Sequence, residues 1–110
     1  PQKTPTISQI LVVQRLSEAA ADFVVQRELI DGDGEQLIFN TVSLQTQSNE
    51  DQFTELLLDL HWRLYGIRAA DEWVSEIKLM WDIINSESGP DEAWKALLAA
   101  MFQDPMMMGY

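Results

Sequence analysis

The sequence predicts an α+β fold, in which a three-stranded antiparallel meander is followed by three helices packed on one face of the sheet. Between residues 7 and 46 the apolar residues form short β-branched runs, which are typical of strands. After residue 46 they recur at the three- and four-residue spacing of an amphipathic helix. The 110 residues suit one domain, so we expect a flexible leader at residues 1–6 and a single α+β domain over residues 7–110.

The three expected strands lie at residues 10–13, 23–25 and 37–44. Asp33 and Gly34 are expected to join the second and third strands, because an Asp-Gly pair readily adopts the positive φ angles of a two-residue hairpin turn. With this pair at the centre of the turn, apolar residues of the two strands face each other. A shift of one residue would mix apolar with polar residues, so the pattern favours the Asp33-Gly34 register.

The first part of the chain permits an alternative to the meander. The run Ser-Glu-Ala-Ala-Ala that begins at Ser17 favours a helix, and residues 7–30 would then form one amphipathic helix. The inward-facing residues of that helix would be Ile10, Val13, Ala20 and Phe23.

The second half of the chain predicts three helices. Ser48 or Asn49 is placed to cap the first helix and Gly66 to end it. Its apolar stripe consists of Phe53, Leu56, Leu57, Leu60 and Leu64. A second helix is expected over about residues 70–85, and a third begins at Pro90, a residue favoured in the first helical turn. The stripe of the second helix consists of Trp73, Ile77, Met80, Trp81 and Ile84, and the third helix ends near Phe102.

The residue types limit the chemistry that the chain can perform. Cysteine is absent and His61 is the only histidine, which excludes thiolate nucleophiles and zinc sites built on two histidines. We expect His61 at the boundary or surface of its helix, and we expect no cofactor, no metal and no enzymatic activity. An enzyme that uses paired carboxylates is the weakest of the alternatives.

The charge limits the partners. Eighteen acidic against seven basic residues give a net charge of −11, which repels phosphate backbones and anionic headgroups, so we expect no direct binding to nucleic acid or membrane. No apolar run is long enough to span a bilayer. A cysteine-free chain is compatible with the reducing cytoplasm, which is the expected localisation.

The acidic and aromatic residues suggest where a protein partner would bind. Eight acidic residues and no Lys or Arg lie between Arg27 and Arg63, which predicts one strongly negative region of the surface. Exposed tryptophans often dominate interfaces, and methionine-rich segments pack adaptably on partners. The predicted partner-binding residues are Glu50, Asp51, Glu55, Trp62, Trp94, Met101, Phe102, Met106, Met107 and Met108.

These observations predict a non-enzymatic protein–protein interaction module: a small acidic adaptor, an assembly chaperone or a subunit of a complex. We expect it to bind a protein partner or to self-associate as a homodimer through its last two helices and the methionine-rich tail. The alternative is an acidic inhibitor that mimics nucleic acid and binds a basic protein.

Overall fold

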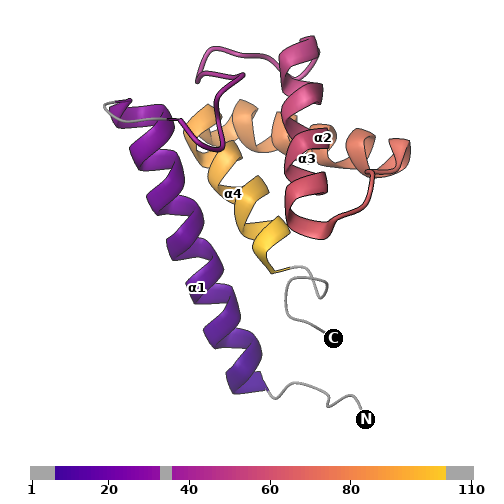
Figure 1. Cartoon of the computed structure of the whole chain (residues 1–110). Coiled ribbons are helices and arrows are strands. Elements are labelled where there is room, and N and C mark those ends of the chain that lie inside the picture. The colour runs from indigo at the N-terminus through magenta and orange to yellow at the C-terminus, as the bar shows by residue number, and fades with distance from the viewer. Residues whose placement is uncertain (1–6, 33–35, 104–110) are drawn as a thin grey trace.

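The structure is a computed structural model that describes residues 7–32 and 36–103 (Figure 1). Every regular element in these two ranges is helical, so the predicted α+β fold and its three-stranded meander are wrong. The elements are α1 (Ile7–Val25), the π-helical segment η1 (Gln26–Asp31), α2 (Asp51–Tyr65), α3 (Asp71–Ser88) and α4 (Pro90–Phe102). The predicted leader at residues 1–6 lies outside the described residues.

Helix α1 contains both segments that were predicted as the first two strands. β-Branched residues disfavour a helix by less than about 0.7 kcal/mol each relative to alanine, so the burial of Ala21 and Val25 in the core outweighs the strand preference of this segment. The single-helix alternative is therefore the correct one for residues 7–25. Its inward face differs from the predicted one, however, because Ala21 and Val25 are buried while Ala20 and Phe23 are exposed.

The expected hairpin is replaced by a side-chain connection. η1 ends at Gly32, whose left-handed backbone (φ 64°) suits glycine, and the Gly32 N–H bonds back to Arg27 O. Beyond the gap in the described residues, the chain returns to η1. There the buried Glu28 carboxylate accepts the backbone N–H groups of Ile38 (2.8 Å) and Phe39 (3.0 Å). The turn centre predicted at residues 33–34 lies outside the described residues, and the predicted third strand has no regular structure.

The three predicted helices of the second half are confirmed. α2 begins after Glu50, one residue beyond the predicted caps, and ends at Gly66, whose φ of 70° is the left-handed conformation expected of a C-terminal glycine. α3 extends to Ser88, three residues past the predicted end. α4 starts at Pro90 as expected.

An aromatic cluster forms the centre of the core. The Phe53 ring of α2 meets Trp81 of α3 edge-to-face, with ring centroids 4.9 Å apart, and packs at a tilt on Trp94 of α4, with centroids 4.8 Å apart. Phe39 meets Trp94 at 5.2 Å in an edge-to-face arrangement. The indole N–H groups of both tryptophans lack a hydrogen-bond acceptor among the described residues, so the rings stabilise the core by packing alone.

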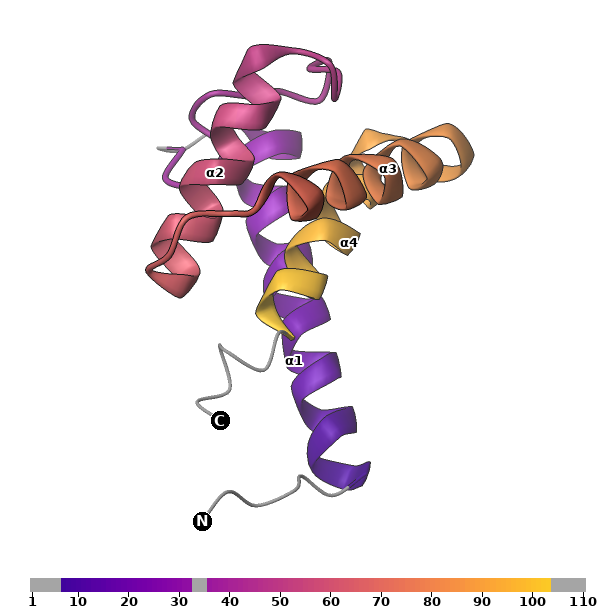
Figure 2. The same ribbon diagram turned by 90° about the vertical axis from the view of Figure 1, so that its right-hand side faces the viewer.

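α1, the longest of the described helices, forms one side of the molecule (Figure 1). α1 packs along α4 in the antiparallel sense, because Asp22 pairs with Lys95 while Glu18, one turn earlier, shares a groove with Gln103. α3 crosses the direction of both helices, and the first turns of α1 project beyond the end of α4 (Figures 1 and 2). The first turns of α1 therefore have no other described helix packed against them.

Candidate interaction surface

The exposed apolar residues of the described chain are concentrated on α1. Leu16 and Phe23 are 65% and 62% exposed, values that leave most of each side chain in water. The large apolar residues exposed on this helix are Ile7, Leu11, Val12, Leu16 and Phe23. α1 is thus the main apolar surface that the fold leaves uncovered.

A regular stripe runs along the side of α1 that faces away from α4. We call Val12, Leu16, Ala19 and Phe23 the outward stripe; all four are exposed. Their successive spacings of four, three and four residues place them on one face of a helix, in the pattern that pairs helices in coiled coils. Figure 1 shows this side of α1 free of other elements of the described chain.

The face of α1 that contacts α4 carries small side chains instead. Ser17 and Ala21 are buried one turn apart, followed by Val25 and then Glu28 of η1. Small residues allow two helices to approach closely without large interlocking side chains. The fold therefore packs Ser17, Ala21 and Val25 in the bundle and leaves the larger Leu16 and Phe23 in solvent.

The carboxylates of α1 lie beside α4 and not on the outward stripe. Asp22 pairs with Lys95 (2.9 Å), which also lies 3.5 Å from Glu92. The hydrogen bond from Lys95 to Asp22 is the main cause that raises the pKa of the Lys95 ammonium above its ordinary value. Together with Glu18 these groups line a groove of about 560 Å³ between α1 and α4. By helical geometry, no acidic residue of α1 lies within about 60° of the stripe.

A second, apolar groove adjoins the outward stripe. It has a volume of about 250 Å³, and Phe23 forms part of its wall. The other lining residues are Val24, Arg27, Glu28, Leu37 and Ile38. Leu37 is itself exposed, so the apolar surface continues from the stripe onto the segment that Glu28 holds in place.

Comparison with protein-family models, with curated proteins and with solved structures found no match to this chain. The candidate surface therefore rests on its own geometry.

His61 occupies a structural position. It is buried, its Nδ1 lies 2.8 Å from Ile67 O, and its ring meets the edges or faces of Tyr65 and Trp73. The sequence predicted His61 at the boundary or surface of its helix; this prediction is wrong, because the side chain is buried among aromatic rings. Within the two described ranges, no three His, Asp or Glu side chains are grouped as a metal ion would require.

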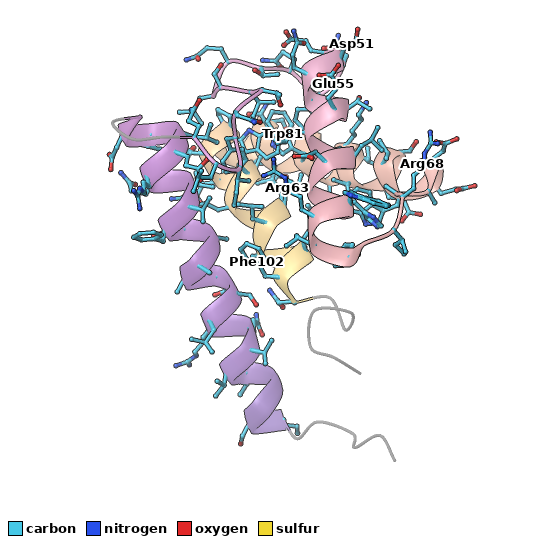
Figure 3. The ribbon with its side chains drawn as sticks, viewed as in Figure 1. Asp51, Glu55, Arg63, Arg68, Trp81 and Phe102 are labelled. Atoms are coloured by element: carbon cyan, nitrogen blue, oxygen red, sulfur yellow. The ribbon has the colours of Figure 1, made fainter. Side chains whose placement is uncertain are left out.

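The predicted partner-binding residues fall into three groups. Trp62, Asp51 and Glu55 are exposed, and Figure 3 shows Asp51 and Glu55 at the first turns of α2. Glu50 is exposed too, and it accepts the backbone N–H of Gln47. Trp94 and Met101 are fully or almost fully buried, and Phe102 is half-buried at the end of α4. Met106, Met107 and Met108 lie outside the described residues.

Sequence reasoning did not find the outward stripe. It placed Phe23 in a strand of the meander or on the inward face of a single helix, and it did not single out Leu16 as a surface residue. The available signal was the spacing of four, three and four residues from Val12 to Phe23, which the β-branched neighbours obscured.

None of the described helices has the length and hydropathy needed to cross a bilayer.

Proposed function

We propose that the chain is a non-enzymatic protein-interaction module whose docking surface is the outward stripe of α1. The observation that carries the proposal is the distribution of side chains around this helix. Ser17 and Ala21 are buried against the bundle, whereas the larger Leu16 and Phe23 are exposed to water. A partner that covered them would gain on the order of 1.5–3 kcal/mol for each large apolar side chain removed from water. Docking therefore has a driving force that does not compete with folding.

Three kinds of interaction protein fit this proposal: an adaptor, an assembly chaperone and a subunit of a complex. In each, a stable helical body would present one helix to another protein, as in the recognition of amphipathic helices through residues one turn apart. We assign this function to the cytoplasm, a compartment with which a cysteine-free chain is compatible.

The nucleic-acid mimic has weaker support than the apolar docking surface. Two of the acidic residues between Arg27 and Arg63 are already engaged within the chain. The buried Glu28 carboxylate accepts hydrogen bonds from two backbone N–H groups, and Asp59 forms an ion pair with Arg63 at 2.9 Å. The negative region is accordingly less continuous than the count of carboxylates along the sequence suggested.

Site-specific photo-cross-linking in cells of the source organism would test the function. A photoreactive amino acid replaces Leu16, and a second variant carries it at Leu79 of α3, whose side chain is 62% exposed and so equally accessible. We expect a discrete protein adduct from position 16 and none from position 79. Equal adducts from both positions, or none from any residue of the outward stripe, would contradict a docking role for α1.

A further inference from the structure

We propose that the partner of the outward stripe is a second copy of this chain, and that the two α1 helices pair in the antiparallel sense. The inference rests on the proposed function, because it names the protein that docks on the same surface. Three properties of α1 support it: the register of its stripe, the distribution of its charges and the room around it.

The register of the stripe allows the two copies to interlock. In an antiparallel pair with its two-fold axis at the height of residues 17–18, Leu16 of one copy lies beside Ala19 of the other. Val12 of one copy lies beside Phe23 of the other in the same arrangement. Each layer then combines a larger with a smaller side chain, which lets the helices approach closely along the whole stripe.

The charges at the edge of the stripe are complementary in this register. Arg15 and Asp22 are seven residues apart, so they occupy the same edge of the helix. The two-fold axis brings Arg15 of one copy to the same edge as Asp22 of the other, about 3 Å apart along the helix axis. Arg15 has no ion pair with any described residue. Asp22 keeps 62% of its side chain exposed beside Lys95, so it can accept a second cation. Two Arg15–Asp22 pairs would therefore border the contact.

The net charge selects this face for self-association. Two copies of a chain with a charge of −11 repel each other, and the repulsion is least where the contact brings no carboxylates together without an intervening cation. α3 also exposes two large apolar residues, Leu79 and Ile83. Glu76 shares that face with them, and the other carboxylates of the same face are Glu72 and Glu87. A symmetric contact through α3 would bring those acids together, whereas one through α1 would not.

The arrangement of the fold leaves room for the second copy. Figure 1 shows the other helices of the described chain on one side of α1. Helical spacing puts the outward stripe opposite the buried Ser17 and Ala21, and so on the other side of the helix. The apolar groove beside Phe23, walled also by Leu37 and Ile38, widens the surface beyond a single pair of helices. The contact is thus larger than the four residues of the stripe.

Sedimentation equilibrium of the full chain, from low to high micromolar concentration, provides the first test. We expect a reversible dimer that Leu16→Gln weakens by about a hundredfold, because each dimer loses two buried leucines. Leu79→Gln is the matched control, since Leu79 is as exposed as the residues of the stripe, and it should leave the dimer unchanged. Helical circular dichroism of each variant establishes that it remains folded.

Charge reversal tests the antiparallel register itself. Arg15→Asp and Asp22→Arg should each weaken the homodimer about three- to tenfold, because each puts like charges opposite one another in two places. Mixing the two variants should restore association, because the mixed dimer has complementary pairs on both sides. A mixture no tighter than either variant alone would overturn the register.

The outcomes also separate this inference from the proposed function. A monomer at every concentration, whose position 16 nevertheless cross-links to a different protein, would overturn self-association and leave the docking surface intact. A monomer without any adduct from the stripe would overturn both proposals. A dimer lost with Leu79→Gln and kept with Leu16→Gln would overturn the assignment to α1.

Discussion

α4 buries Trp94, Leu97 and Leu98 against the other helices, whereas α1, which packs along it, leaves Leu16 and Phe23 in solvent. The two helices are similarly rich in apolar residues, so apolar content alone does not decide which side chains form the core. The position of the small residues does, because they mark where another helix approaches. In α4 the large residues stabilise the fold, and in α1 they are available to a partner.

The replacement of Trp94 by alanine should have the largest effect on stability. Trp94 is fully buried and its ring contacts those of Phe39, Phe53 and Trp81, so Trp94→Ala should lower the free energy of unfolding by about 3–5 kcal/mol. Urea unfolding followed by circular dichroism measures the loss. Trp62→Ala, at a tryptophan that is 60% exposed, should change stability by no more than about 0.5 kcal/mol. Similar losses for the two variants would show that α4 is not the centre of the core.

Enlarging the small residues of α1 tests the close contact between α1 and α4. Ala21 is fully buried, and Ala21→Leu should lower the free energy of unfolding by about 1–3 kcal/mol because the helices would have to separate. Ala20→Leu makes the same change one residue away on the exposed side, where it should be tolerated within about 0.5 kcal/mol. Thermal and urea unfolding of both variants compare the two faces directly. A tolerated leucine at position 21 would mean that α1 is held elsewhere.

The same contrast explains which parts of the fold were predictable. In α2 one face is apolar and the other polar, so the helical period stands out in the sequence, and Gly66 marks its end. α4 has no continuous polar face, but Pro90 followed by two acidic residues marks its start. In α1 the large apolar residues lie on the outward side and small ones face the bundle. Apolar residues on both sides obscure the helical period, and the valines then resemble short strands.

The contact between residues 36–39 and η1 could not be predicted from the sequence for a different reason. It depends on one buried carboxylate, Glu28, which binds two backbone N–H groups ten and eleven residues away. No local pattern signals such a contact. The candidate site was missed together with α1.

The ion pair between α1 and α4 should contribute little to stability. Asp22→Asn should lower the free energy of unfolding by about 0.2–1 kcal/mol, an effect that shrinks as salt rises, because the Asp22 side chain is 62% exposed. Asp22 raises the pKa of Lys95, so the contribution is present at neutral pH and is lost as the pH rises through the pKa of the folded state. Urea unfolding at low and high salt measures the difference. A loss that is independent of salt would contradict a screened surface pair.

The smallest effect on stability should come from the residues with the largest effect on association. Leu16→Gln leaves every contact between α1 and the bundle in place, and glutamine is nearly as good a helix former as leucine. At concentrations where the wild type is monomeric, its free energy of unfolding should therefore stay within about 0.5 kcal/mol of the wild-type value. Urea unfolding at several protein concentrations separates the two roles, because binding to a second copy stabilises only the wild type as concentration rises. A stability loss that persists in dilute solution would instead make Leu16 part of the core, and α1 would then use its apolar residues as α4 does.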